Sequence, residues 1–136
     1  MPHLCRACLV YCIDFRFHRA LEAFLHDQGL DKDGTDIVQL AGAAKSLAHM
    51  GEGAGGEFLL EQIQISQRLH GVRQIYLVNH EDCGAYGLED EVDSEEELTT
   101  HRKDLRTART VLEEHFPGAE ILTYFMHLNG KPELIE

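Results

Sequence analysis

The stretch Leu9-Val-Tyr-Cys-Ile-Asp-Phe-Arg16 begins as an apolar run and ends in three residues that carry chemistry, Cys12, Asp14 and Arg16. The apolar run predicts a buried strand from about Leu9 to Asp14. Because side chains alternate between the faces of a strand, Cys12, Asp14 and Arg16 are expected to point in one direction. This stretch therefore predicts a strand that delivers reactive groups to one place.

A second apolar run, Gln74 to Val78, leads in a similar way into a turn that holds His80 and Cys83. If the two strands are parallel neighbours, both motifs reach the carboxyl end of the sheet, where open α/β sheets bind ligands. Cys12, His80 and Cys83 would then supply the sulfur and nitrogen ligands that zinc prefers. Three protein ligands leave a fourth position open for water, as a catalytic zinc site requires.

The rest of the chain alternates predicted strands and helices, which favours a single α/β domain covering residues 1–136. Helices are expected at about 17–28, 41–50, 57–70 and 94–115, and further strands at about 37–40, 120–125 and 133–135. Asn129-Gly130 predicts a closing hairpin. The expected architecture is a mostly parallel four-stranded sheet with an antiparallel edge strand and helices on both faces.

Two of the predicted helices carry local signals. In the helix at 57–70, a buried stripe is expected to consist of Phe58, Leu59, Ile63 and Leu69. At the start of the last helix, Ser94-x-x-Glu97 resembles a capping box. Residues 31–36 have the composition of a turn.

The formal net charge of −12, from 24 acidic and 12 basic side chains, argues against binding to nucleic acid or to anionic membranes. No apolar run approaches the roughly 18 residues of a membrane helix. The N-terminal residues do not have the pattern of a secretory signal, so a cytoplasmic location is expected.

The two reactive motifs are similar to those of a known family. Cys-Ile-Asp-Phe-Arg at 12–16 and His-Glu-Asp-Cys-Gly at 80–84 resemble the Cys-x-Asp-x-Arg and His-x-x-Cys-Gly signatures of the β-class carbonic anhydrases. Residues 58–78 resemble the helix and strand that precede the second signature, and residues 124–134 resemble the closing hairpin. The resemblance covers nearly the whole chain.

This resemblance implies a zinc ion held by Cys12, His80 and Cys83, with Asp14 and Arg16 as the catalytic pair and no further cofactor. It implies reversible hydration of carbon dioxide to bicarbonate by metal-bound hydroxide, that is, a lyase. Asp14, held by Arg16, is expected to stay off the metal and to accept a hydrogen bond from its water. A homodimer, or a dimer of dimers, is also implied.

Two departures from the family pattern affect these expectations. The family's Arg-Asn-Ala-Gly-Asn stretch is represented by Gln39-Leu-Ala-Gly-Ala43, and only eight residues precede the first strand, in place of a long helical arm. The first change leaves carbon disulfide or carbonyl sulfide open as substrates of a related hydrolase. The second makes an altered or weaker dimer plausible.

Other readings compete for the same residues. Cys5-x-x-Cys8 could join His80 and Cys83 in a closed structural zinc site of a non-catalytic protein. This alternative assigns no role to Asp14 and Arg16. Otherwise Cys5 and Cys8 are packing residues or a minor redox pair. His18 lies near Asp14 in sequence and is a candidate proton shuttle, although a surface role is the commoner outcome for histidine.

Two further patterns have plain interpretations. Gly51-x-Gly53-x-x-Gly56 matches a dinucleotide-binding fingerprint, but it does not follow a predicted strand, so a loop is the better interpretation. The carboxylates of residues 89–97 are expected to form a solvated surface whose negative charge suits the start of a helix.

Overall fold

The structure is a computed structural model that describes residues 3–88 and 92–136. Five strands form one sheet in the order β2-β1-β3-β4-β5. Their bounds are β1 Ala7–Tyr11, β2 Thr35–Gln39, β3 Gln74–His80, β4 Glu120–Met126 and β5 Pro132–Ile135. The α-helices are α1 His18–Asp27, α2 Leu30–Asp33, α3 Lys45–Ala48, α4 Gly55–His70 and α5 Ser94–His115.

The four strands β2, β1, β3 and β4 are parallel, and β5 pairs antiparallel with β4 at one edge. The predicted fold class is therefore confirmed. Between β1 and β3 the order of strands reverses direction, because the chain leaves β1 toward β2 on one side and returns to β3 on the other. In an open α/β sheet such a switch point opens a crevice at the carboxyl ends of the strands.

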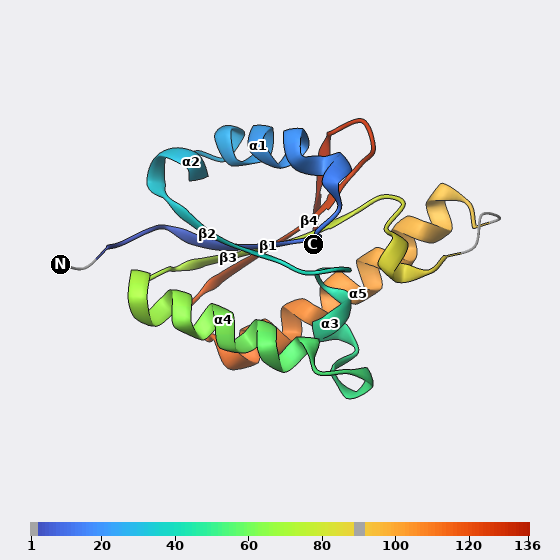
Figure 1. Ribbon diagram of the computed structural model, residues 1–136. Coiled ribbons are helices and arrows are strands. Elements are labelled where there is room, and N and C mark those ends of the chain that lie inside the picture. Colours follow the sequence, from blue (N-terminus) through green and yellow to red (C-terminus); the bar gives the residue numbers. More distant parts are fainter. Residues whose placement is uncertain (1–2, 89–91) are drawn as a thin grey trace.

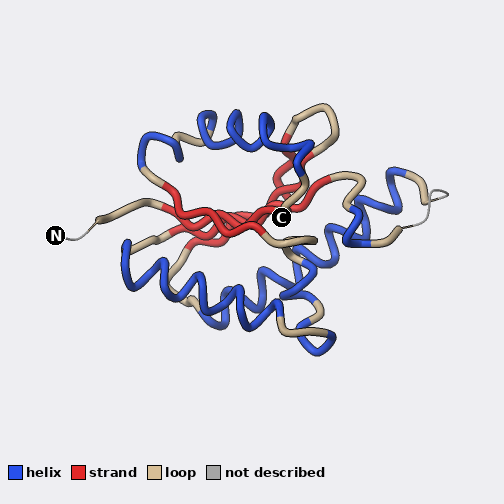
Figure 2. Tube along the Cα trace, in the orientation of Figure 1, coloured by secondary structure: helices blue, strands red, loops and turns tan. Residues whose placement is uncertain are grey.

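The sheet lies between two layers of helices (Figures 1 and 2). α1 and α2 cover one face, and α3, α4 and α5 cover the other. Because side chains alternate between the two faces of a strand, β1 contributes to a hydrophobic core on each face of the sheet. Leu9 and Tyr11 pack toward α1, whereas Cys8 and Val10 pack toward α4 and α5. Both motifs predicted to carry chemistry follow these central, fully covered strands.

Local details differ from the sequence-based expectations. β1 ends at Tyr11 and not at Asp14, so strand alternation does not orient the residues that follow. The helix expected at 41–50 is reduced to a turn, the four-residue α3 and a 3₁₀ turn at Met50–Glu52. Residues 30–33, placed partly in a turn, form the short α2.

Two helix predictions were partly wrong. On α4, Leu59 and Ile63 are buried as expected, but Phe58 and Leu69 are exposed. The first turn of α5 is capped by Asp93, whose carboxylate accepts a hydrogen bond from the Glu96 N–H, and not by Ser94. Glu95, Glu96 and Glu97 do lie in this turn, where the helix dipole favours negative charge. The expectation for residues 89–91 lies outside the described residues.

Within the two described ranges, no helix combines the length and the hydropathy needed to cross a membrane.

Candidate metal centre

Cys12, His80 and Cys83 meet at the carboxyl ends of β1 and β3. Cys12 directly follows β1, His80 is the last residue of β3, and Cys83 lies three residues further on. One ligand atom from each lies within 4.8 Å of the others, and the two Sγ atoms are 3.9 Å apart. The three residues are only 4%, 1% and 5% exposed, respectively. The parallel register of β1 and β3, in which Val10 is opposite Leu77, brings the two motifs together.

The orientation of the His80 ring leaves one nitrogen available for a metal. Nδ1 lies 2.8 Å from the carbonyl oxygen of Glu81. Because a carbonyl only accepts, Nδ1 carries the proton and Nε2 carries the free lone pair. Nε2 is buried and has no hydrogen-bond partner among the described residues. A buried nitrogen of this kind, next to two cysteine sulfurs, fits a zinc ion, which takes tetrahedral sulfur and nitrogen ligands.

The surroundings of Cys12 favour its thiolate form. Hydrogen bonding with Cys83 lowers the pKa of the Cys12 thiol, and the backbone N–H groups of Gly42 and Asp14 act in the same direction. The neighbouring Cys12 thiolate raises the pKa of Cys83. Since the thiolate is the form that binds metal, Cys12 is prepared for coordination.

Asp14 and Arg16 form a tight ion pair at the edge of this cluster. The Arg16 guanidinium donates Nη2–H to Asp14 Oδ2 at 2.6 Å and Nε–H to Oδ1 at 3.1 Å. The Arg16 backbone N–H adds a third donor at 2.9 Å, because Asp14 caps the 3₁₀ turn Phe15–Phe17. These hydrogen bonds, all donated by Arg16, lower the pKa of Asp14 to about 2. Asp14 Oδ2 lies 3.8 Å from His80 Nε2.

The same arginine also anchors the turn that carries Cys83. Its Nη1–H donates to Asp82 Oδ2 at 2.9 Å, and Nη2–H donates to the Asp82 carbonyl oxygen at 2.8 Å. Asp82 has a φ of 58°, an unfavourable region for a residue with a side chain. The carboxylate of Glu97 accepts the Asp82 N–H at 2.8 Å. Asp82 and Glu97 were missed by sequence reasoning, because nothing in their spacing indicates these contacts.

A third chain segment, the turn at 41–44, closes the cluster. Gly42 has a φ of 82°, and a Cβ built there would lie 3.3 Å from the Cβ of Ala85. The Ala44 N–H donates to Asn79 Oδ1 at 3.0 Å, which ties this turn to the end of β3. The Gln39 side chain donates to the Cys12 carbonyl oxygen at 3.1 Å. The stretch that departs most from the family pattern therefore still supports Cys12.

A surface cavity of about 450 Å³ opens beside Cys12, Asp14 and Arg16. Ile13, Phe15, Ala41 and Ala85 give its wall a largely apolar character. A small, uncharged molecule can therefore approach the Cys12 and Asp14 side chains without displacing a charged group.

Cys5 and Cys8 are not part of this cluster. Cys5 precedes β1 and Cys8 lies in its first half, whereas Cys12 follows its end. Cys8 is fully buried in the core on the α4 side of the sheet. The closed site of Cys5, Cys8, His80 and Cys83 considered above is therefore wrong.

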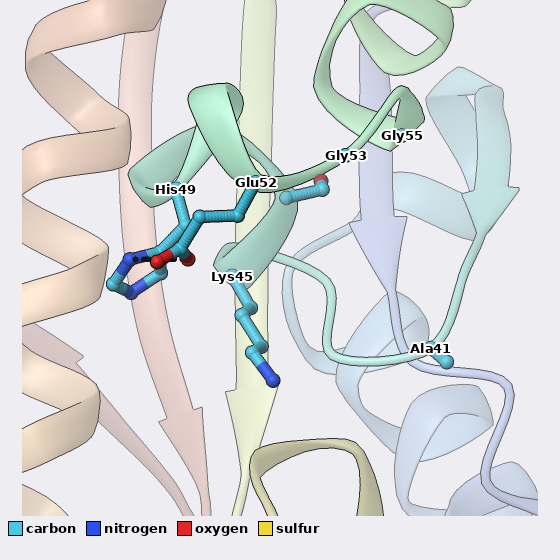
Figure 3. Close-up of a pocket in the computed structure, with 7 residues that line it drawn as sticks. Ala41, Lys45, His49, Glu52, Gly53 and Gly55 are labelled. Carbon is cyan, nitrogen blue, oxygen red and sulfur yellow. Dashed lines mark ion pairs between the residues drawn. The ribbon is translucent and has the colours of Figure 1, made fainter.

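The glycine-rich segment at 51–56 is a loop only at residues 53–54. Its first two residues belong to the 3₁₀ turn Met50–Glu52, and its last two begin α4. As expected, it does not follow a strand. The cavity beside this segment has a volume of about 170 Å³. Glu52 pairs there with His49 at 3.3 Å. Figure 3 shows that the Lys45 side chain points away from this pair. The Lys45 ammonium group donates to the Ala85 carbonyl oxygen. The Glu52 carboxylate at the cavity disfavours a phosphate ligand.

A zinc-type cluster at the switch point of a parallel sheet, with an Asp–Arg pair at its edge, is the arrangement expected of a β-carbonic anhydrase-like protein. The family model described as "Putative carbonic anhydrase" matches residues 3–136, and the chain belongs to this family.

Two proteins described as uncharacterized are similar over most of their length. One, from Rickettsia conorii (strain ATCC VR-613 / Malish 7), is 34% identical over 131 residues, covering 93% of this chain and 70% of the relative. The other, from Rickettsia bellii (strain RML369-C), is 33% identical over 131 residues, covering 93% and 79%.

Proposed function

We propose that this protein is a zinc enzyme that hydrates carbon dioxide reversibly to bicarbonate. The observation that carries this proposal is the buried, unpaired Nε2 of His80, which faces two cysteine sulfurs and lies 3.8 Å from the Asp14 carboxylate. Membership of the family supports the same reaction. Asp14 and Arg16 are the proposed catalytic pair, and Cys12, His80 and Cys83 are the proposed zinc ligands.

Zinc, when bound by these residues, would lower the pKa of a water molecule to about 7 and so make a nucleophile available at neutral pH. Asp14 would accept a hydrogen bond from that nucleophile and orient its lone pair toward the carbon of the substrate. Because its pKa is about 2, Asp14 remains a carboxylate, and thus an acceptor, throughout the neutral range. Arg16 fixes the direction of this acceptor through two parallel N–H donors.

The cavity wall favours an uncharged, linear substrate. Ile13, Phe15 and Ala85 offer no polar atom from their side chains, and the charged Asp14 and Arg16 beside them are paired with each other, so this wall accommodates carbon dioxide. Carbon disulfide and carbonyl sulfide share this shape and polarity, and hydrolysis of one of them is the second candidate function.

A direct test is stopped-flow hydration of carbon dioxide followed with a pH indicator, using the zinc-loaded protein. We expect hydration well above the uncatalysed rate, and loss of that activity after zinc is chelated and removed. A parallel assay for hydrogen sulfide release from carbon disulfide and carbonyl sulfide separates the two candidates. No activity in any of these assays would overturn the proposal and favour a non-catalytic zinc protein.

We also propose that two copies of the chain associate near this site. Phe15, which is 78% exposed, and Ile13 lie at the mouth of the cavity, and a partner subunit would cover them. Sedimentation velocity should report a dimer for the wild type, and the Phe15→Ser variant should shift the distribution toward monomer. A wild-type protein that remains monomeric at high concentration would contradict this arrangement.

A further inference from the structure

A second group of metal-binding residue types lies at the opposite end of the sheet. Cys5 precedes β1, Asp36 is the second residue of β2, and His70 is the last residue of α4. Ligand atoms from these three residues all lie within 4.8 Å of one another. The backbone holds the group together, because the Cys5 N–H donates to the His70 carbonyl oxygen at 3.0 Å. Three segments far apart in the sequence therefore converge here.

The Asp36 carboxylate is the centre of this group. Its Oδ2 accepts hydrogen bonds from Ser66 Oγ at 2.6 Å and from His70 Nδ1 at 2.7 Å. The Asp36 and His70 side chains are each 32% exposed. An ion from solvent can therefore reach them, and protein atoms would still cover most of the two side chains. A shallow cavity of about 210 Å³ borders Asp36, Ser66 and His70.

We propose that Cys5, Asp36 and His70 form a second divalent metal site, which takes zinc. A thiolate, an imidazole nitrogen and a carboxylate oxygen are the three ligand types that zinc uses in proteins. In a tetrahedral site with bonds of about 2.0 to 2.3 Å, ligand atoms are roughly 3.3 to 3.8 Å apart, which small side-chain rotations achieve here. The net charge of −12 further favours the uptake of a cation.

The cysteine distinguishes this group from an ordinary histidine–carboxylate pair. His26 and Asp31 form such a pair, with Nδ1 and Oδ2 3.0 Å apart, but His26 is highly exposed and this pair does not belong to either of the candidate metal clusters found among the described residues. His70 and Asp36 have in addition the Cys5 sulfur and the Ser66 hydroxyl, which fixes the carboxylate. A metal at this position would connect the N-terminal segment, the edge strand β2 and the end of α4.

The second site is independent of the candidate active site. Cys5 and Cys12 lie beyond opposite ends of β1, on the order of 20 Å apart, since a strand rises about 3.3 Å per residue. Binding of zinc to one site is therefore measurable when the other site has been disabled. Failure of the second site would also leave the proposed carbon dioxide hydration untouched.

The test is the number of zinc ions bound per chain, measured by elemental analysis after equilibrium dialysis against buffered zinc. We expect two ions for the wild type and one for both Cys5→Ser and His70→Gln, with carbon dioxide hydration unchanged in both variants. His26→Gln is the matched control and should retain two ions. A wild type that saturates at one ion, or a His70→Gln variant that retains two, would overturn the proposal.

Cobalt offers a second readout that does not depend on the first site. In the Cys12→Ser/Cys83→Ser variant, bound Co²⁺ should give a near-ultraviolet sulfur-to-metal charge-transfer band that comes from Cys5 alone. Adding Cys5→Ser should abolish this band. If the double variant does not fold, the same band is measured as a decrease between wild-type and Cys5→Ser proteins, and equal bands in those two would contradict the assignment.

Discussion

The two ends of the sheet carry similar residues in very different surroundings. At the carboxyl end, Cys12, His80 and Cys83 are at most 5% exposed. At the amino end, the Asp36 and His70 side chains are each 32% exposed and bond to one another. The difference suggests that burial and fixed orientation, more than ligand type, separate a candidate catalytic centre from a candidate binding site.

Supporting contacts differ as strongly as burial does. His80 Nδ1 is committed to the Glu81 carbonyl oxygen, so that Nε2 is left free. His70 Nδ1 is instead occupied by Asp36. The carboxyl end also has Arg16, which holds both Asp14 and the turn of Asp82. Such outer contacts orient ligands before a metal binds.

The largest expected difference in carbon dioxide hydration is between variants that lose one cysteine sulfur at the carboxyl end or at the amino end of the sheet. Cys12→Ala should lower carbon dioxide hydration by more than about 10³-fold, because the proposed zinc nucleophile is lost with the metal. The matched Cys5→Ala variant should keep its activity. Stopped-flow assays of the two proteins give the comparison, and equal losses would show that the two ends are not functionally distinct.

The next largest difference in hydration rate is expected between variants in which a carboxylate at one end or the other is replaced by an amide. Asp14→Asn should reduce the rate of hydration by about 10²-fold or more, because a positioned acceptor is lost. Its zinc content should not change. Asp36→Asn serves as the control and should hydrate carbon dioxide at the wild-type rate. Full activity in Asp14→Asn would contradict the role proposed for this residue.

Replacing the arginine that supports the carboxyl end should have an intermediate effect. We expect Arg16→Gln to reduce activity by roughly 10- to 100-fold, as for other partners of metal-site residues. Arg102→Gln removes an arginine of comparable exposure that pairs with Glu133, and it should have no effect on the rate.

The Arg16→Gln variant should also differ from the wild type in how its stability depends on pH. Arg16 lowers the pKa of Asp14 from 3.8 to about 2 in the folded protein. A lowered carboxyl pKa stabilises the fold above the unfolded value, and this stabilisation is lost as the pH falls through the folded value. The difference in unfolding free energy between wild type and Arg16→Gln should therefore be constant above about pH 5 and shrink toward pH 2. Urea titrations across this range measure it, and a difference that grows on acidification would contradict the assignment.

The smallest effect is expected from Glu97, which holds the strained turn through the Asp82 N–H. Glu97→Ala should cost about 1 kcal/mol of stability and less than tenfold in activity, since one hydrogen bond is lost. Glu95→Ala, in the same helical turn, is the control, because it loses the same interaction with the helix dipole without losing a hydrogen bond to Asp82. It should keep the wild-type rate and be destabilised less than Glu97→Ala. Urea denaturation midpoints and hydration rates measure the two effects. Loss of all activity in Glu97→Ala would contradict this minor role.

Sequence reasoning predicted the parts of the fold that depend on regular spacing. The apolar runs before Cys12 and His80 predicted two buried strands, and their parallel pairing follows from the helical segments between them. The pairing of Asp14 with Arg16 was also expected, although a 3₁₀ turn and not a strand brings it about. The individual strands and the Asp14–Arg16 pair are each encoded by a few neighbouring residues, whereas the parallel pairing rests on the longer alternation of strands and helices.

Apart from the meeting of Cys12 with His80 and Cys83, contacts between distant segments could not be predicted in this way. Nothing in the sequence near Asp82 indicates that Arg16 and Glu97 hold it, and the convergence of Cys5, Asp36 and His70 depends on the register of β1 with β2. The burial of α4 was misjudged for a related reason. The periodicity of apolar residues shows that a helix has an apolar face, but it does not specify how much of that face the sheet covers. Phe58 lies beyond the covered part and is exposed.

The most direct measurement is zinc-edge anomalous diffraction from crystals of the zinc-loaded protein. We expect a peak about 2.3 Å from Sγ of both Cys12 and Cys83 and about 2.0 Å from His80 Nε2, with a solvent molecule as fourth ligand. A peak whose fourth ligand is a protein side chain, or the absence of a peak between these three atoms, would contradict the proposed catalytic centre.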